Sequence, residues 1–239
     1  MLNIDDAASH AVDKNAAAPV TLKVFDGEIV GLVCGSFSLR SAIAKLLSGE
    51  TATGSGRIQL AGRDVTGASP EARCRLGMIR LPAVTTLIPE LTAAENVVLG
   101  CAPRPAPLYP RDGRLTYQQT AKAALEFAGL EASADMLAGQ LPMNQKYALT
   151  VAIAAANKPS LLLVEDTGEP GSGAAAIGDL LLRLHEEGVA VLVLAARAGG
   201  LIEMCERIEY LQSPLVAGEG TRNARIVYRL YRDRHANWR

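Results

Sequence analysis

Residues 27–41 of the chain have the sequence Gly27-Glu28-Ile29-Val30-Gly31-Leu32-Val33-Cys34-Gly35-Ser36-Phe37-Ser38-Leu39-Arg40-Ser41. The apolar run Ile29–Val33 is short and continuous, and it follows the turn-forming segment Asp26-Gly27-Glu28. Such a run predicts a strand that is buried on both faces, as in a parallel sheet. Helix-forming residues follow from Ser41 to Leu47, and Gly49 is a helix stop signal. The stretch therefore predicts a strand, a turn and a helix in direct succession.

Strands and helices are predicted on both sides of this stretch. Short apolar or alternating runs predict strands at 57–60, 78–81, 160–164 and 190–194. Helical composition and spacing predict helices at 117–129, 145–157 and 177–187, and four prolines predict an irregular loop at 101–113. The strand at 57–60 alternates and leads into a turn, so we expect it at a sheet edge. The pattern is helical between Leu81 and Leu161, which predicts a helical lobe inserted into an α/β core.

The composition limits the class of protein. A length of 239 residues is ample for a sizeable hydrophobic core. Hydrophobic residues make up 49% of the chain but aromatic residues only 4%, a balance typical of α/β proteins in which helices pack closely on a sheet. The net charge of −1 gives no overall field that would attract nucleic acid, so we expect no nucleic-acid partner.

Signals of cellular location point to the cytoplasm. The segment Met1–Lys14 is polar and acidic, unlike a signal peptide, and no apolar run reaches the roughly 18 residues that would span a bilayer. The cysteines are far apart and lack metal-ligand spacing, which predicts buried thiols in a reducing compartment. They are Cys34, Cys74, Cys101 and Cys205. We therefore expect a soluble cytoplasmic protein.

Several ordered segments resemble one known family. Gly27–Leu32 matches a strand that leads into a phosphate loop, and Gly54–Ile58 and Gly62–Val65 match the hairpin that follows it. The segment Pro89-Glu90-Leu91-Thr92-Ala93-Ala94-Glu95-Asn96-Val97 is similar to the segment after the family's Q-loop. Along nearly its full length the chain resembles the ATP-binding subunit, or nucleotide-binding domain, of ABC transporters. The resemblance implies an α/β fold of the P-loop NTPase type, with a mixed, mostly parallel sheet, flanking helices and an inserted helical subdomain.

The resemblance also implies how the chain is organised. We expect one nucleotide-binding domain, with its α/β core at 1–82 and 150–215, its helical subdomain at 83–149 and a basic tail at 216–239. Ser69–Arg73 and Cys205–Arg207 resemble importers of ribose-type sugars, whereas Leu141-Pro142 resembles importers of branched-chain amino acids. Alternation at Ile226, Tyr228 and Leu230 favours a strand and a solvated end for the tail over contact with lipid headgroups or an acidic partner.

The family's phosphate loop falls on residues 34–41. Such a loop needs glycines, so that successive backbone N–H groups turn toward the anion, followed by Lys and then Ser or Thr. Phe37 and Leu39 stand in glycine slots, where bulky residues resist a positive φ, and Arg40 replaces the lysine. The favoured interpretation is a structural strand–turn–helix without a ligand. The candidates for a vestigial phosphate loop are Gly35, Ser36, Arg40 and Ser41.

The family's acidic pair falls on Glu165-Asp166, and its order is reversed from Asp then Glu. The first carboxylate should orient Mg²⁺ and the second should polarise the attacking water. Asp166 stands in the catalytic Glu slot but is one methylene shorter, which matters where a shift of about 1 Å lowers the rate. Ser41 and Glu165 are weak candidates for metal ligands. The favoured interpretation is a solvated or locally capped pair of carboxylates.

Other nucleotide contacts of the family are replaced as well. The signature should present Ser-Gly-Gly, at a helix N-terminus, to the γ-phosphate bound by the partner subunit. Here the segment is Leu141-Pro142-Met143-Asn144-Gln145. The Q-loop glutamine slot falls on Ala83, the switch histidine slot on Ala196 and the adenine-stacking slot on Ala11. The candidates for a vestigial signature are Leu141, Asn144 and Gln145, and no residue is assigned a catalytic role.

These replacements predict a catalytically degenerate subunit, a pseudo-ATPase. Charge-assisted hydrogen bonds contribute about 1.5–3 kcal/mol each. Losing two or three of them at the phosphates would therefore lower the affinity by about three to four decades. No cofactor is expected, with weak ATP·Mg²⁺ binding as the alternative.

The resemblance implies partners and a location. We expect a structural or regulatory partner of an active second ABC ATPase and an integral membrane permease in a sugar or amino-acid import system. The protein would lie at the inner face of the cell membrane, with Pro89 and Glu90 as candidates for docking to the permease. One alternative is a slow ATPase that uses Arg40, Ser41 and the acidic pair. Another is a free-standing scaffold or regulator that uses the dimer face of the ABC fold.

Overall fold

A computed structural model of the chain describes residues 1–9, 19–101, 113–166, 177–199, 204–211 and 230–231. The strands are β1 (Leu2–Ser9), β2 (Val20–Val24), β3 (Ile29–Cys34), β4 (Thr53–Leu60), β5 (Arg63–Asp64), β6 (Met78–Leu81), β7 (Leu161–Glu165), β8 (Ala190–Ala195), β9 (Arg207–Leu211) and β10 (Leu230–Tyr231). The α-helices are α1 (Phe37–Ser48), α2 (Pro70–Arg75), α3 (Ala93–Gly100), α4 (Gly113–Ala128), α5 (Met143–Ala156) and α6 (Gly178–Glu186). Two short 3-10 helices, η2 (Glu131–Ser133) and η3 (Ala138–Gln140), lie between α4 and α5.

Two sheets organise the described part of the chain. The larger has the strand order β10-β9-β3-β8-β7-β6, and its strands are parallel except for β10, which runs antiparallel to β9. The smaller is antiparallel, with the order β2-β1-β4-β5. The prediction of a mixed, mostly parallel sheet with flanking helices and an inserted helical subdomain is therefore confirmed.

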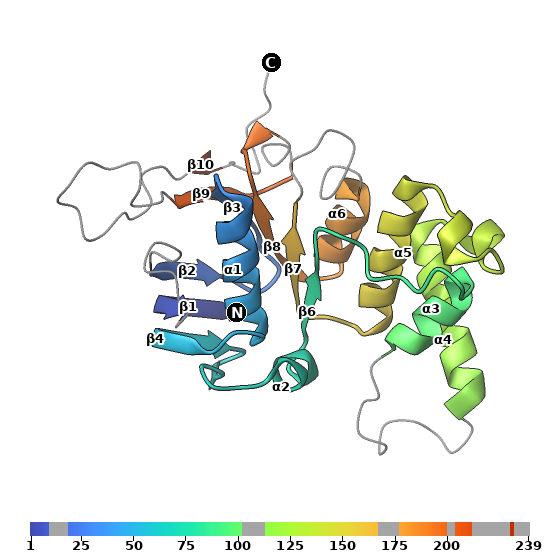
Figure 1. Cartoon of the computed structure of the whole chain (residues 1–239), viewed down its shortest axis with the longest axis horizontal. Coiled ribbons are helices and arrows are strands. Elements are labelled where there is room, and N and C mark those ends of the chain that lie inside the picture. Colours follow the sequence, from blue (N-terminus) through green and yellow to red (C-terminus); the bar gives the residue numbers. More distant parts are fainter. Residues whose placement is uncertain (10–18, 102–112, 167–176, 200–203, 212–229, 232–239) are drawn as a thin grey trace.

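Three buried clusters define the layers (Figure 1). The first joins α1 to the small sheet and to one face of the large sheet. The second joins α5 and α6 to the opposite face of the large sheet. The third holds α3, α4 and α5 together as a helical lobe. Since α5 belongs to two clusters, it connects the lobe to the sheet, while the residue limits of the core and the helical subdomain stay a prediction.

Some predicted elements differ from the structure. The segment 57–60 was expected at a sheet edge, but it is part of β4, which pairs with both β1 and β5. The short strand β5 covers that side instead, so the edge prediction is wrong. Strand β1 was not predicted; Leu2, Ile4 and Ala7 turn inward along it, and the charged residues between them face outward. The loop expected at 101–113 falls mainly on residues outside those described, as does most of the basic tail.

The helix after β3 also begins earlier than expected. We predicted it from Ser41, and α1 begins at Phe37. The Ser36 side chain caps it by accepting a hydrogen bond from the Leu39 backbone N–H at 3.3 Å. The helix ends at Gly49, whose φ of +85° suits glycine. Because Ser36 is a favourable N-cap and no glycine interrupts 37–40, the helix extends back almost to the strand.

Candidate functional site

The turn between β3 and α1 is short. Cys34 ends the strand and Phe37 begins the helix, so only Gly35 and Ser36 separate them. Among the described residues with a positive φ, none lies between Cys34 and Ser41. A phosphate nest is formed by successive N–H groups in alternating right- and left-handed conformations. The backbone here has instead the geometry of a capped helix start.

Two side chains of α1, those of Phe37 and Arg40, lie next to this turn. Phe37 is 59% exposed at the first position of α1, and the Arg40 guanidinium carbon lies 5.7 Å from the centre of its ring. Arg40 is buried, and its Nη1 donates a hydrogen bond to the Cys34 carbonyl at 3.0 Å. Its guanidinium therefore folds back onto the end of the strand. Ser41, on the next position of α1, is half-buried.

Cys34 offers no nucleophile beside the turn. Its side chain is fully buried, and its Sγ–H donates to the Leu32 carbonyl. Burial raises the pKa of the thiol to about 12, against a small opposing effect of the Arg40 charge. The thiol is therefore protonated at neutral pH and has the properties of a core residue.

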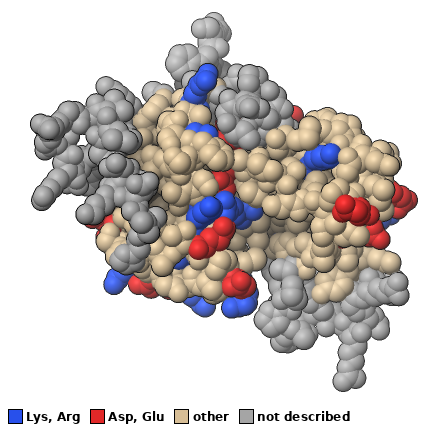
Figure 2. Space-filling view, viewed as in Figure 1, with Lys and Arg blue, Asp and Glu red and all other residues tan. Residues whose placement is uncertain are grey.

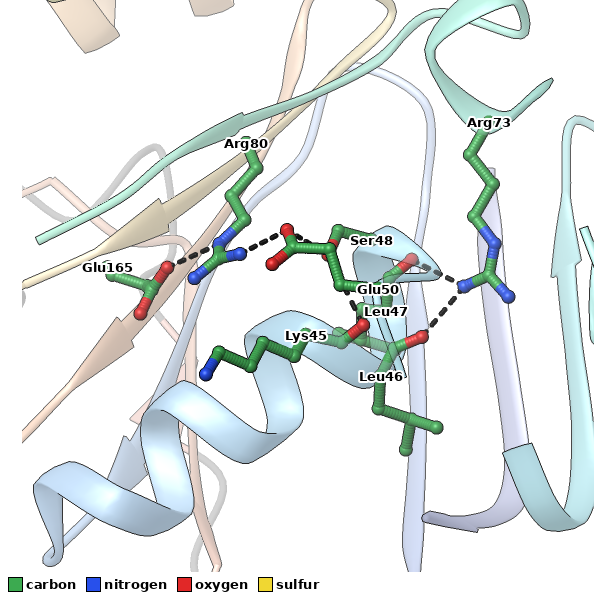
Figure 3. Close-up of polar contacts among 8 residues, drawn as sticks. All are labelled: Lys45, Leu46, Leu47, Ser48, Glu50, Arg73, Arg80 and Glu165. Atoms are coloured by element: carbon green, nitrogen blue, oxygen red, sulfur yellow. Dashed lines mark hydrogen bonds and ion pairs between the residues drawn. The ribbon is translucent and has the colours of Figure 1, made fainter. Parts of the chain in front are cut away.

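The acidic pair lies at the end of β7. Glu165 is only 5% exposed, and its Oε1 accepts a hydrogen bond from Arg80 Nε at 2.6 Å. Arg80, on β6, also pairs with Glu50, which follows α1 (Figure 3). Asp166 is half-buried, and its backbone N–H donates to the Leu194 carbonyl at 2.9 Å. The carboxylate in the metal slot is thus held by a guanidinium of the same chain.

The charge of Arg80 also acts on Glu50. Burial works to raise the pKa of Glu50, but hydrogen bonds from Arg80 and Ser48, with the nearby charges of Arg80 and Lys45, outweigh it and lower that pKa. Glu50 and Arg80 were not singled out in the sequence. The available signal was a charged residue at the third position of a four-residue strand whose ends are both buried.

The parallel register brings several predicted slots to one edge of the large sheet. Val33 is level with Ala195, and Glu165 is level with Leu194. The turn at Gly35-Ser36 and the residue Ala196 therefore follow neighbouring strand ends. In open α/β sheets ligands bind at this carboxyl edge. Ala83 follows β6 at the same edge and is buried, whereas Ala11 lies outside the described residues.

The signature segment belongs to the helical lobe. Leu141 is buried in the core of the lobe, and Pro142 is the N-cap of α5, with no side-chain cap bond. Asn144 is exposed, and Gln145 Oε1 accepts a hydrogen bond from the Ser133 hydroxyl at 3.3 Å. Met143, at the first position of α5, is 55% exposed. These residues therefore present amide and thioether groups, and no hydroxyl, at the start of the helix.

The segment before α3 is firmly held. Thr92 and Glu95 form a capping box, and the buried Asn96 side chain bonds the backbone of Ile88 through both its amide nitrogen and its oxygen. Pro89 and Glu90 are exposed, and Gly139 donates a backbone hydrogen bond to the Pro89 carbonyl. The predicted docking residues thus lie on a fixed, solvent-facing turn. Sequence reasoning did not assign Asn96 this role.

The visible surface carries little concentrated charge. Figure 2 shows basic and acidic side chains side by side near the middle of this face, further mixed charges along its lower left, and acidic side chains over the helical lobe on the right. Across the described ranges, no group of three or more His, Cys, Asp or Glu side chains is placed to hold a metal ion. None of the helices in those ranges is both long and apolar enough to cross a membrane.

The two sheets, the strand–turn–helix junction at the carboxyl edge and the inserted helical lobe together define an ATP-binding cassette fold. The model of the ABC transporter family matches residues 17–173, which is well over half of the chain. The chain therefore belongs to the ABC transporter family.

The relatives support this assignment. A ribose import ATP-binding protein of Mesorhizobium japonicum is 28% identical over 192 residues, which are 78% of this chain and 36% of that protein. The chain spans 36% to 39% of the length of the curated relatives that it matches first. The crystal structure of a nucleotide-free ATP-binding cassette from an ABC transporter has a TM-score of 0.78 at 18% identity, covering 98% of this chain and 92% of that one. A dimeric post-hydrolysis cassette bound to ADP and Pi has a TM-score of 0.73 at 22% identity, covering 89% and 95%.

Proposed function

We propose that this protein is an ATP-binding-type subunit of a solute import system that has lost ATP hydrolysis. The observation that carries the proposal is the turn between β3 and α1, which is only two residues long. Phe37 is exposed at the first position of α1 and Arg40 donates to the Cys34 carbonyl, which supports a turn that is not arranged around a triphosphate. The reversed pair Glu165-Asp166 and the alanines at the switch and Q-loop slots also favour a loss of ATP hydrolysis.

Mg²⁺ does not fit the acidic pair as it stands. A hard divalent cation needs open carboxylate oxygens together with other oxygen ligands. Glu165 Oε1 already accepts from Arg80 Nε at 2.6 Å, so the guanidinium occupies the approach to that oxygen. We therefore assign no metal-dependent step to this chain.

A nucleotide titration tests the proposal against the slow-ATPase alternative. We expect the purified chain to bind ATP·Mg²⁺ no tighter than millimolar in calorimetry, and to release phosphate at the background rate. The physical reason is that no residue of the fully described segment Cys34–Ser41 has a positive φ, so the backbone lacks the alternating conformation of a phosphate nest. Micromolar binding, or turnover that disappears in Glu165→Gln/Asp166→Asn, would establish the slow ATPase instead.

The substrate and partners of the system are part of the proposal. The relatives matched first include ribose import ATP-binding proteins, which favours a ribose-type sugar. The dimeric cassette of the same fold favours pairing with a second ATP-binding subunit. Such a pair would work beneath an integral permease on the cytoplasmic side of the membrane. The free-standing scaffold remains the alternative, because it would use the same fold without a permease.

We propose that the turn with Pro89 and Glu90 contacts the permease. It is rigidly held by Asn96, and its neighbours Val84 and Ile88 expose apolar side chains, at 73% and 38%. Tagged protein purified from detergent-solubilised native membranes should bring down a polytopic permease and an intact second ATPase, identified by mass spectrometry. Glu90→Arg should lower the recovered permease severalfold, because it reverses an exposed charge at the contact.

Glu131→Arg is the matched control. It reverses an equally exposed charge on η2, at another part of the lobe, and should leave recovery unchanged. Equal recovery with wild type and Glu90→Arg would remove the docking proposal. Recovery of the second ATPase without any permease would favour the scaffold.

A further inference from the structure

The side chains of Arg80 and Glu165 lie on the same face of the large sheet. Strands β6 and β7 are parallel, and Arg80 is level with Leu163, two residues before Glu165. Met78, Leu161 and Leu163 pack into the cluster that contains α1. Because side chains alternate along a strand, Arg80 and Glu165 also face α1.

Arg80 makes two contacts from this position. Its Nε donates to Glu165 Oε1 at 2.6 Å, and its Nη1 contacts Glu50 Oε1 at the far end of α1. Ser48 donates to the same Glu50 oxygen at 2.9 Å. Figure 3 shows the guanidinium lying between the two carboxylates, so one cation links β6, β7 and the segment after α1.

The burial of Glu165 and Arg80 determines how strongly each charge depends on the other. Glu165 is 5% exposed, and the Arg80 side chain is 17% exposed. An isolated carboxylate with so little water would be strongly destabilising unless an opposite charge lay beside it. The role that a divalent cation plays for a buried carboxylate is therefore performed here by a side chain.

We infer that Arg80 supplies, from within the chain, the positive charge that a bound divalent cation would otherwise supply at Glu165. The inference rests on the proposed function, since it assumes that Glu165 occupies the metal slot of the family. If the inference is right, the protein folds fully without metal, because the guanidinium of Arg80 is part of the chain. Removing that guanidinium should then make the thermal stability depend on a divalent metal ion.

The test compares the wild type with Arg80→Met and Arg80→Lys. Methionine keeps much of the stem but leaves Glu165 without its cation, and we expect the Tm to fall by roughly 5–10 °C. Millimolar Mn²⁺ should recover part of that loss in Arg80→Met and leave the Tm of the wild type and of Arg80→Lys unchanged. Electron paramagnetic resonance should show loss of free Mn²⁺ with Arg80→Met alone.

The double variant Arg80→Met/Glu165→Gln keeps the test valid if Arg80→Met does not fold. It removes the charges of both Arg80 and Glu165. We therefore expect it to be more stable than Arg80→Met, with a Tm that Mn²⁺ does not change. Manganese binding by the wild type would overturn the inference. It would also be overturned by an Arg80→Met protein that is folded but indifferent to Mn²⁺, or by a double variant no more stable than Arg80→Met. The ATP titration of the wild type tests the proposed function alone, so the two ideas can fail separately.

Discussion

The two ends of helix α1 are built in different ways. At the N-terminal end the residues 35–38 are all exposed, and the helix is capped by the single side chain of Ser36. At the C-terminal end Arg73 is almost completely buried and donates to the Leu46 and Leu47 carbonyls at 2.8 and 2.6 Å. Gly49 closes that end with a left-handed turn, and its N–H bonds the Leu46 carbonyl.

The difference shows which end positions the helix. The other nitrogen of the Arg73 fork donates to the Val65 and Thr66 carbonyls, so one side chain ties the helix end to the segment after β5. The guanidinium satisfies carbonyls that a helix end leaves without partners. The helix is therefore fixed by its C-terminal end, and its N-terminal end is free to change without loss of the fold.

The largest expected effect is at Arg73. Arg73→Met should lower the free energy of unfolding by about 3–5 kcal/mol, because it removes four hydrogen bonds that a buried guanidinium donates to main-chain carbonyls. Urea unfolding followed by circular dichroism measures the change. Arg75→Met is the control: Arg75 is exposed and lies on α2, the helix that also carries Arg73. This variant should stay within about 0.5 kcal/mol of wild type. Equal stabilities for the two variants would refute the idea that α1 is held from this end.

A smaller effect is expected at Gly49. Gly49→Ala should lower the free energy of unfolding by about 3 kcal/mol, because its φ is +85° and a Cβ would lie 2.7 Å from the Ala68 carbonyl oxygen. Gly62→Ala is the matched control, with a φ of +76° and open space around the added Cβ. It should lose only about 1 kcal/mol, from backbone strain alone. Thermal unfolding of both variants separates the steric clash at Gly49 from the backbone strain that both positions share. If Gly62→Ala lost as much stability as Gly49→Ala, the close packing of Gly49 against Ala68 would not be the cause.

The smallest effect is expected at the other end of α1. Ser36→Ala removes the cap and should lower the free energy of unfolding by about 1 kcal/mol. Ser36→Gly should lower it by only a few tenths of a kcal/mol, since glycine is tolerated at N-caps. Comparing the urea unfolding midpoints of the two variants with that of the wild type measures both losses. A loss at Ser36 as large as that at Arg73 would erase the contrast between the two ends.

Much of the fold could be predicted from the sequence. The strands β3, β7 and β8 are continuous apolar runs, and a run buried on both faces needs few assumptions to identify. Strand β1 could not be found in this way, because its charged positions hide the alternation and its burial depends on β2 and β4. The start of α1 was misplaced because the prediction rested on helical composition, which begins at Ser41, and did not use the capping chemistry of Ser36, which favours a helix from Phe37.

The candidate site was predictable only in part. The carboxyl ends of parallel strands meet at one edge, so strand order alone predicts that the slots at Gly35, Glu165 and Ala196 gather there. A charge inside a short strand marks Arg80 as unusual, but that its partner is Glu165 could not be found, because the pairing depends on the register of β6 against β7. That register is set by packing across the sheet and leaves no local mark in the sequence. The functional roles of the slots themselves stay a prediction.

The place of β3 in the large sheet has a consequence for biosynthesis. Its register partners are late in the chain: Ile29 is level with Val191 and Val30 with Arg207. A nascent chain that leaves the ribosome N-terminus first therefore exposes an apolar strand until residues 190–211 have been made, while the lobe of α3–α5 can already assemble from nearby residues. Chains that stop before β8 would keep both edges of β3 unpaired and would tend to aggregate. Completion of the large sheet around β3 thus depends on the synthesis of β8 and β9.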